Sequence, residues 1–320
     1  MNLDIISVGS AGFDIFISGK EIRPSQFASD GALNLQNDNS YDIEHSVYEA
    51  GGSGLNSAIT FARQGIKTGC IARTGKDHLA NQIKIIAKHE ELENDLLISN
   101  PEHHTDINIH MVTERSHEIR LTYQNSINSL RASDIRFPDI SARLIYLAEL
   151  PTDLRIYKFF ENFAKLKGAQ LAINISSSKS YKRRHLNFVL SSVDRIMMPI
   201  AFATELFGGV TEPSELIRQL IALGAKSVLL YDINKEAYAY EDSTLYSCGQ
   251  YKNINALDFT GSEDVFSASY TASVFQQKSV PEALTIASAN ACSVLEVFGA
   301  RAGILKKPAL RTMNVQTGGL

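Results

Sequence analysis

The sequence predicts an α/β protein built on a mainly parallel β-sheet that helices cover on both faces. Short apolar segments with the composition of strands alternate with longer segments of helical periodicity, which is the pattern of parallel β-α units. The 320 residues are 44% hydrophobic and 21% charged, an ordinary balance for a folded protein with a large core. No Pro-, Ser- or Gly-rich linker divides the chain, so we expect a single domain over residues 1–320.

The predicted elements follow one another in a regular order. The core strands are expected at Leu3–Val8, Thr68–Arg73, Leu144–Leu147, Gln170–Ile175, Arg195–Met198 and Lys226–Tyr231. The helices are expected at Leu55–Gln64, His78–Glu90, Asp153–Lys167, Ala203–Phe207, Pro213–Leu223, Asp264–Gln277 and Pro281–Val297. Two parts of the chain interrupt this order with the alternation of a half-exposed strand. The first comprises Phe13–Ser18 and Ile43–Tyr48, and the second spans Asp106–Thr122.

The stretch Asp258–Phe266, with the sequence DFTGSEDVF, predicts a turn of small residues that opens a long helix. Phe266, Tyr270 and Val274 are spaced four residues apart and form one apolar stripe of that helix. The first turn of a helix has unpaired N–H groups and the positive end of the helix dipole, so it is a suitable place for a phosphate. Asp264 in that turn is placed to accept a proton from a substrate hydroxyl.

A purely structural interpretation accounts for the same turn. Thr260 and Glu263 fit the capping-box pattern S/T-x-x-E, in which each side chain accepts a hydrogen bond from the backbone N–H of the other residue. Short motifs of this kind occur often by chance, so the turn alone favours the capping box over a phosphate site. A second motif far upstream changes that balance.

The second motif, GGSGLNSAITFARQG, covers Gly51–Gly65 and predicts a strand-to-helix turn that a ligand can approach. The strand-like segment Ser46–Tyr48 precedes it, and Gly65 is suited to end the helix in a left-handed conformation. The four small residues Gly51–Gly54 allow a ligand close to the backbone, and Asn56 offers both a hydrogen-bond donor and an acceptor. A plain strand-to-helix turn would need one glycine rather than three.

These two motifs, in this order and near opposite ends of the chain, resemble the ribokinase-like (PfkB) family of sugar and nucleoside kinases. The resemblance extends over nearly the whole chain through the segments Val8–Ser10, Asp14, Arg73–Asp77, Glu149–Pro151, Asn290 and Phe298–Gly303. It implies a three-layer fold with a small β-sheet lid, built from strands at about 13–18, 43–48 and 106–122, over the sugar pocket. Such a lid excludes water from the reaction, and its sheet edges make a homodimer through the lid a reasonable expectation.

The resemblance further implies an ATP-dependent kinase that phosphorylates a hydroxyl of a sugar, nucleoside or related small polyol. Asp264 occupies the place of the catalytic base, and Gly261, Ser262 and Glu263 occupy the place of the anion hole. The residues placed at the acceptor are Asp14, Gly51, Gly52, Ser53, Asn56 and Glu149, and those placed at the nucleotide are Thr260, Gly261 and Asn290. ATP and Mg²⁺ are the implied cofactors, and we recognise no set of metal ligands in the sequence.

The nucleotide side of the chain departs from the family pattern. The signature D-T-x-G-A-G-D is changed at its second, fifth and sixth positions, which hold Phe259, Ser262 and Glu263. Pro199 and Phe202 stand at the expected Asn and Glu of the N-x-x-E motif, and residues 231–237 lack both glycines of the T-x-G-x-x-G loop. These departures favour an alternative function, that of a catalytically impaired relative that binds a sugar or nucleoside as a sensor or scaffold.

Charge and cysteine content bear on partners and location. A formal net charge of −4 gives no general reason to expect nucleic acid, and the short basic cluster Lys182–His185 is typical of a solvated helix face. The three cysteines are isolated and odd in number, which favours reduced thiols and a cytoplasmic location. No apolar run reaches the roughly 18 residues of a membrane helix, so we expect no membrane partner.

Overall fold

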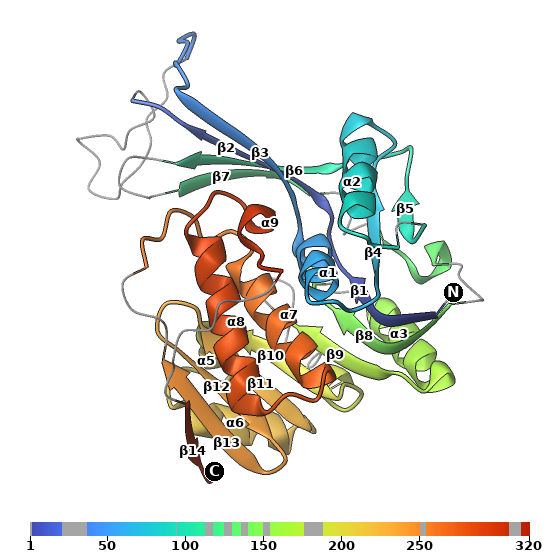
Figure 1. The fold of residues 1–320 in the computed structure, drawn as a ribbon, viewed down its shortest axis with the longest axis vertical. Helices are drawn as coiled ribbons and strands as arrows, with labels where there is room; N and C mark the ends of the chain where they lie inside the picture. The colour runs from blue at the N-terminus through green and yellow to red at the C-terminus, as the bar shows by residue number, and fades with distance from the viewer. Residues whose placement is uncertain are drawn as a thin grey trace.

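The computed structural model describes residues 2–20, 37–93, 95–112, 118–124, 130–135, 140–149, 154–175, 188–249, 254–306 and 315–320. Within these ranges the chain forms an α/β fold with one large and one small sheet (Figure 1). The basic cluster predicted at 182–185 lies outside the described residues, and so do Leu150 and Pro151. None of the helices in the described ranges combines the length and apolar character needed to cross a lipid bilayer.

The large sheet is mainly parallel, as predicted. Ten strands of the described residues form it in the order β14-β13-β12-β11-β10-β9-β8-β1-β4-β5. Their bounds are Asn2–Val8 (β1), Thr68–Thr74 (β4), Leu97–Ser99 (β5), Ser141–Leu147 (β8), Gln170–Asn174 (β9), Arg195–Pro199 (β10), Ser227–Asp232 (β11), Glu236–Glu241 (β12), Thr244–Gly249 (β13) and Val315–Gly318 (β14). The pairs from β5 to β11 are parallel, and β11 to β14 pair antiparallel.

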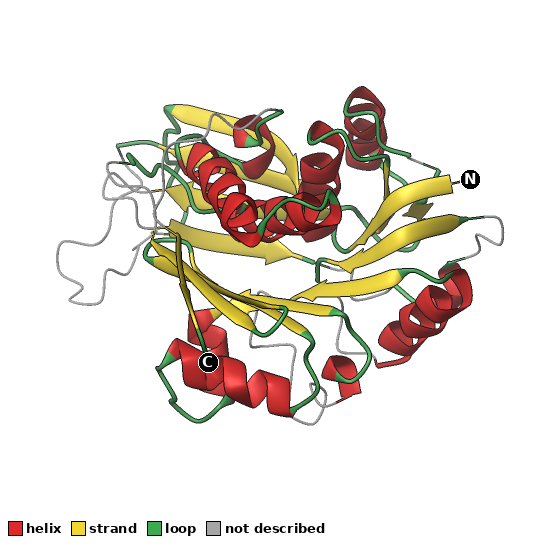
Figure 2. Cartoon of the chain, turned by 60° about the horizontal axis from the view of Figure 1, so that its bottom comes forward, coloured by secondary structure: helices red, strands yellow, loops and turns green. Residues whose placement is uncertain are grey.

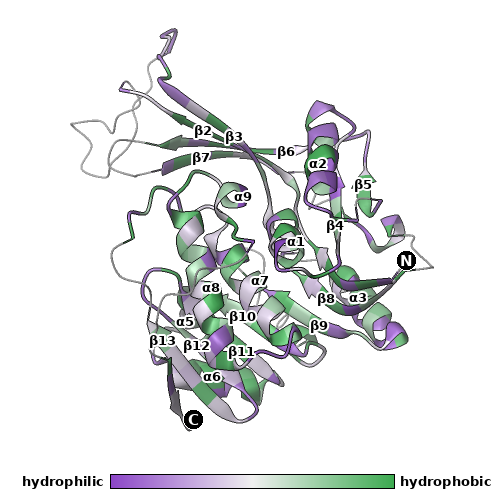
Figure 3. Cartoon of the chain, viewed as in Figure 1, coloured by the Kyte–Doolittle hydropathy of each residue, from purple (hydrophilic) through white to green (hydrophobic). Residues whose placement is uncertain are grey.

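Helices cover both faces of this sheet and complete three layers (Figure 2). One face carries α1 (Ser53–Arg63), α2 (His78–His89), α7 (Ser262–Phe275), α8 (Val280–Leu295) and the short α9 (Ala300–Gly303). The other face carries α3 (Leu154–Lys167), α5 (Ile200–Leu206) and α6 (Pro213–Ala222). The parallel strands are apolar along both faces because both are buried, and Figure 3 shows hydrophobic residues where sheet and helices pack.

The small sheet is the predicted lid. Its strands are β3 (His45–Gly51), β2 (Gly12–Ser18), β6 (Asp106–Val112) and β7 (Glu118–Tyr123), in that order across the sheet. Register places Tyr48, Ile15, Ile109 and Leu121 in one row across all four strands. The neighbouring row contains Glu49, Asp14, Asn108 and Thr122. Their side chains point to the opposite face of the sheet, because successive residues of a strand point to alternate faces. One face of the lid is therefore apolar and the other polar.

The structure adds an antiparallel extension that the sequence analysis did not predict. The strand expected to end at Tyr231 continues through Asp232, and the chain returns as β12 after the turn at residues 233–235. The segment 231–237, taken from the family pattern to be a loop, is therefore a tight hairpin. Strand β5 was also missed, because three residues are too few for a periodic pattern. That residues 1–320 form one domain stays a prediction.

Candidate active site

The turn between β3 and α1 is built on two glycines that no other residue could replace without displacement. A Cβ added to Gly51 would lie 2.2 Å from Asp14 Oδ2, and Gly52 has a φ of 101° with the backbone of Ser10 2.7 Å from its missing Cβ. Ser53 begins α1, and its N–H donates to Ser10 Oγ over 2.9 Å. The two hydroxyl groups also lie 3.1 Å apart, so the Ser53 side chain fastens the turn to the end of β1.

Asn56 joins the two sequence motifs. Its Nδ2 donates to Asp264 Oδ2 over 3.2 Å, although the two residues are 208 positions apart in the chain. The side chain of Asn56 is 2% exposed, and its Oδ1 has no hydrogen-bond partner among the described residues. This contact brings the turn at Gly51–Asn56 and the first turn of α7 together around one small space.

The start of α7 is open rather than capped by a side chain. Gly261 is the N-cap in a left-handed conformation, with a φ of 72°, and no side chain caps the helix. Thr260 instead donates its hydroxyl and its N–H to Asp258 Oδ1, over 2.8 and 3.0 Å. The capping-box interpretation of Thr260 and Glu263 is therefore wrong, because Asp258 takes the Thr260 side chain.

The first N–H groups of α7 are in part available to a ligand. The N–H of Ser262 donates to the carbonyl of Phe259 over 3.2 Å. Within the described part of the chain, the N–H groups of Gly261, Glu263 and Asp264 have no hydrogen-bond acceptor. Unpaired N–H groups at a helix start, together with the helix dipole, favour an anion at this position.

Several carboxyl groups lie around this space, and three of them have a raised pKa. Asp264 is buried, and this burial raises its pKa to about 7, with added contributions from Glu149, Glu263 and Asp14, against the hydrogen bond from Asn56. Burial likewise raises the pKa of Glu263 to about 7, helped by the charges of Asp232 and Glu149. Burial also raises the pKa of Glu149, which directly follows β8. A carboxyl group with a pKa near 7 can exchange a proton with a substrate at neutral pH.

Asn290 is placed differently from the other predicted residues. It is fully buried in α8, where its Nδ2 donates to Ser269 Oγ and its Oδ1 accepts the N–H of Leu305, both over 2.8 Å. Both ends of the side-chain amide thus hold the segment after α9 against α7. Its predicted contact with a nucleotide stays a prediction.

Three residues of the site were missed by the sequence analysis. Asn108 and His110 of β6 both reach Asp14 Oδ1, with Asn108 Nδ2 at 2.8 Å and His110 Nε2 at 3.1 Å. Asp258 accepts the N–H of Gly299 on its second oxygen over 2.9 Å and so ties the segment before α9 to the start of α7. The signal for the first pair was present, because alternate residues of the predicted strand Asp106–Thr122 share one face.

The nucleotide side differs from the acceptor side in its fit to the implied cofactors. Pro199 is the N-cap of α5, and Phe202 is buried in the core, so neither supplies a polar group to the site. In the described ranges no group of three or more His, Cys, Asp or Glu side chains could hold a metal ion. We therefore recognise no protein-only metal site among the described residues, whereas the open start of α7 fits a phosphate.

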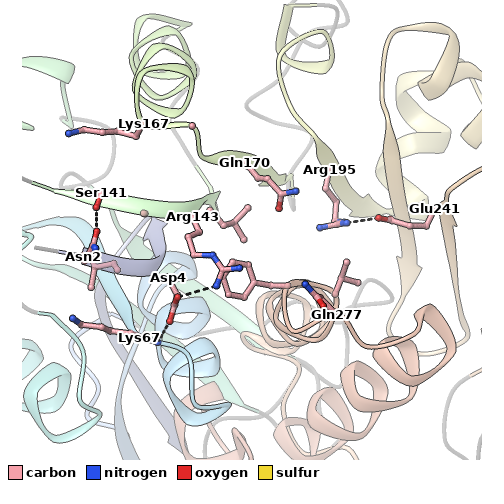
Figure 4. Close-up of a pocket in the computed structure, with 16 residues that line it drawn as sticks. Asn2, Asp4, Lys67, Ser141, Arg143, Lys167, Gln170, Arg195, Glu241 and Gln277 are labelled. Atoms are coloured by element: carbon pink, nitrogen blue, oxygen red, sulfur yellow. Dashed lines mark hydrogen bonds and ion pairs between the residues drawn. The ribbon is translucent and has the colours of Figure 1, made fainter.

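A separate cavity of about 680 Å³ lies at the amino ends of the parallel strands of the large sheet (Figure 4). Side chains of positive and of negative charge line this cavity. Arg195 pairs with Glu241 at 2.6 Å, and Arg143 approaches Asp4 at 3.5 Å. None of the predicted site residues lines it. The candidate active site lies instead at the carboxyl ends of the strands, where Glu149 follows β8, and under the lid strand that carries Asp14.

The family follows from the sequence profile that the chain matches. Residues 21–307 match the pfkB family carbohydrate kinases, and the chain belongs to this family.

Solved structures show that the fold is ribokinase-like. The ribokinase of Arabidopsis thaliana, complexed with ribose and ATP, is 19% identical, covers 95% of this chain and 96% of its own, and superposes with a TM-score of 0.75. The nucleoside kinase of Methanocaldococcus jannaschii is 14% identical with a TM-score of 0.76, covering 94% of each chain. A putative ribokinase II from E. coli in complex with ATP and Mg²⁺ is 16% identical with a TM-score of 0.74, covering 94% of this chain and 96% of its own.

Proposed function

We propose that the protein is an ATP-dependent kinase that transfers a phosphoryl group to a hydroxyl of a sugar, nucleoside or related small polyol. Membership of a carbohydrate kinase family supports this proposal. The observation that carries it is the contact of 3.2 Å between Asn56 Nδ2 and Asp264 Oδ2. That contact brings the Gly51–Asn56 turn, where we place the phosphoryl acceptor, next to the uncapped start of α7. Phosphoryl transfer to a hydroxyl needs such an arrangement of both groups around one space.

Each side of the space has a task in the proposed reaction. The sugar or nucleoside that receives the phosphoryl group donates hydrogen bonds from its hydroxyl groups to Asp14 Oδ2, Asn56 Oδ1 and Glu149. These hydrogen bonds orient the hydroxyl groups. Asp264 accepts the proton of the reacting hydroxyl, for which a pKa of about 7 is well placed. ATP supplies the phosphoryl group when bound. The free N–H groups of Glu263 and Asp264 hold that group at the positive end of α7, and the lid keeps water away.

We assign residues of this chain to ATP but none to Mg²⁺. ATP, through its terminal phosphate, would be held by the start of α7, with Thr260, Gly261 and Asn290 on the nucleotide side. The E. coli protein named above was crystallised with ATP and Mg²⁺, which supports the same cofactors here. Because no cluster of metal ligands is recognisable among the described residues, we assign no residue to the metal and no step to it.

The variant Asp264→Asn tests the proposal. Without the base we expect phosphotransfer from ATP to the accepted sugar or nucleoside to fall by about 10²- to 10⁴-fold. Binding of the acceptor, followed by its effect on the melting temperature, should change little because the amide keeps the size of the side chain. Phosphotransfer by Asp264→Asn at the wild-type rate would show that Asp264 is not the base.

A non-catalytic sugar- or nucleoside-binding protein is the second candidate. Glu263 beside the free N–H groups, Pro199 and Phe202 at the family's polar positions and the tight β11–β12 hairpin favour it. A melting-temperature screen with Mg·ATP, ADP, ribose and adenosine separates the two functions. Stabilisation by ribose or adenosine and never by nucleotides favours the binding protein, because a ligand that binds only the folded state raises its melting temperature.

We also propose that the protein is a cytoplasmic homodimer that associates through the lid. The apolar face of the lid, defined by the row Tyr48, Ile15, Ile109 and Leu121, leaves Tyr48 65% and Leu121 54% exposed. A second copy would bury this face and cover the sheet edges. Cys70, Cys248 and Cys292 are buried and form no disulfide within the described residues, which suits a reducing compartment.

A further inference from the structure

His110 lies in the middle of the polar face of the lid and is fully buried. Its Nε2 is 3.1 Å from Asp14 Oδ1, and its Nδ1 is 2.5 Å from Glu118 Oε1. An ionised carboxylate oxygen can only accept a hydrogen bond, so each ring nitrogen must donate and must carry a proton. With both carboxylates ionised, the two contacts need a positively charged imidazolium, which bridges β2 and β7 across β6.

This bridge fixes one oxygen of Asp14 and leaves the other available. Asp14 Oδ1 already accepts hydrogen bonds from Asn108 Nδ2 and His110 Nε2. Asp14 Oδ2 faces the Gly51 turn, where it lies 2.2 Å from the position that a Cβ of that glycine would occupy. The carboxylate therefore cannot rotate to present both oxygens to the lid, and Oδ2 is directed at the space that Asn56 and Asp264 share.

We propose that His110 is a positioning residue, which holds the Asp14 carboxylate with Oδ2 turned toward the phosphoryl acceptor while Glu118 holds His110 in place. The proposal rests on the acceptor site of the proposed function. Its consequence is that binding of the phosphoryl acceptor depends on three of the four lid strands, because the contacts Glu118–His110–Asp14 run from β7 through β6 to β2. Without β7 in register, His110 would lose Glu118, the carboxylate that holds the ring against Asp14.

The charges around His110 support a stable imidazolium. Burial by itself would lower the pKa of His110, but the hydrogen bonds and charges of Asp14 and Glu118 raise it to about 9. The hydrogen bond to His110, with a further one from Arg120, in turn lowers the pKa of Glu118 to about 2. On the far side of Asp14, its neighbour Glu49 pairs with Arg301 of α9 at 2.9 Å. The imidazolium is thus balanced by the carboxylates of Asp14 and Glu118, although it shares the Glu118 oxygen with Arg120.

Aromatic contacts keep the imidazole ring in its plane. Phe16 of β2 stacks on the ring, with centroids 4.3 Å apart and an interplanar angle of 20°. Phe16 in turn packs on Phe298, 5.6 Å away, immediately before the Gly299 that Asp258 holds. A series of direct contacts therefore leads from His110 through Phe16 and Phe298 to the segment that Asp258 ties to the start of α7.

The charge state is tested first, by titrating the histidine side chains by NMR and assigning His110 from its absence in His110→Gln. We expect His110 to titrate above pH 8 in the wild-type protein, and its midpoint to fall by at least about one pH unit in both Asp14→Asn and Glu118→Gln. A wild-type midpoint at or below about 6.5, or one that does not respond to Asp14→Asn, would overturn the proposal. This measurement needs no ligand, so it decides the bridge even if the proposed kinase function fails.

The positioning role is tested with ribose and adenosine as acceptor probes. We expect His110→Gln to raise the KM for the acceptor, or its dissociation constant from melting-temperature shifts, by about tenfold or more, and to leave the KM for ATP within about twofold. His45→Gln, an exposed histidine on the lid strand β3, is the matched control and should leave both unchanged. Glu118→Gln should reproduce the acceptor effect, and circular dichroism confirms folding of each variant.

The outcomes separate the two proposals. Wild-type acceptor affinity in folded His110→Gln or in Glu118→Gln would refute the positioning role whatever the protein catalyses. Stabilisation of the wild type by ribose or adenosine without any phosphotransfer would refute the kinase function, and the loss of that stabilisation in His110→Gln would still support the positioning role.

Discussion

Replacing Glu263 by glutamine is expected to stabilise the folded protein at alkaline pH. Burial, with the charges of Asp232 and Glu149, raises the pKa of Glu263 from 4.5 to about 7. At about 1.36 kcal/mol for each pKa unit, that rise corresponds to roughly 3 kcal/mol of destabilisation once the carboxyl is ionised in both folded and unfolded chains. The side chain is partly exposed, which screens the charge, so we expect a gain of about 1–3 kcal/mol at pH 8.

The gain should depend on pH in a defined direction. Below pH 4.5 the carboxyl is protonated in both states, and its ionisation affects stability little. Between pH 4.5 and about 7 the unfolded chain ionises while the folded chain keeps its proton, so folding stability is lost progressively. Above about 7 both states are ionised and the loss is complete. Glutamine has no such transition, so its advantage is small at pH 4.5 and full at pH 8.

Urea denaturation of wild type and Glu263→Gln at pH 5 and pH 8 measures this difference. The chain has no tryptophan, so unfolding is followed by circular dichroism. The matched control is Glu102→Gln, an exposed glutamate in a loop, which should change the free energy of unfolding little at either pH. An equal effect of Glu263→Gln at both pH values, or none at pH 8, would refute the assignment of a buried, charge-strained carboxyl.

The same variant has a consequence for phosphate binding. An ionised carboxylate 4 Å from a phosphate charge would oppose its binding by about 4 kcal/mol at an effective dielectric constant of 20. Glu263→Gln should therefore lower the KM for ATP, most clearly above pH 7. An unchanged KM for ATP would mean that the Glu263 side chain points away from the phosphoryl position.

Three further predictions follow from particular contacts. Gly261→Ala should destabilise the protein by about 1–3 kcal/mol more than Gly65→Ala in thermal denaturation. The added methyl would lie 2.3 Å from the Cβ of Ala300 at position 261, whereas it would meet nothing within 4 Å at position 65. Leu121→Asp should yield monomers in light scattering, whereas Leu166→Asp, 81% exposed on α3, should leave the dimer intact. Acceptor affinity should weaken as pH rises through about 9, where His110 loses its proton, and be retained below it.

Much of the fold could be predicted because its signals are local or ordered along the chain. Strands such as β1 and β11 are apolar on both faces, and a parallel sheet covered by helices is the arrangement that buries both. The contact between Asn56 and Asp264 could be expected only from the order of two motifs, since nothing near either residue indicates the other. Here the family pattern supplied the long-range information.

The features that were missed depend on tertiary partners or on competing explanations. The hairpin β12–β13 has alternating residues and a two-residue turn at Asp242 and Ser243, both with positive φ. The family pattern predicted a loop at residues 231–237, so the strands after it were not predicted. Thr260 fits a capping box locally, and only the fold brings Gly299 to share Asp258 with it. Alternation identified the strand that carries His110, but not the carboxylates that lie beside the ring.

The double attachment of Asp258 makes two distant stretches of chain behave as one unit. The start of α7 and the segment leading into α9 cannot separate without breaking hydrogen bonds to the same carboxylate, from Thr260 and from Gly299. We expect their amide protons to exchange with solvent cooperatively, at a common rate of local opening. A phosphate that settles on α7 would then slow exchange in the α9 segment as well, so its arrival could be detected about forty residues from the point of contact.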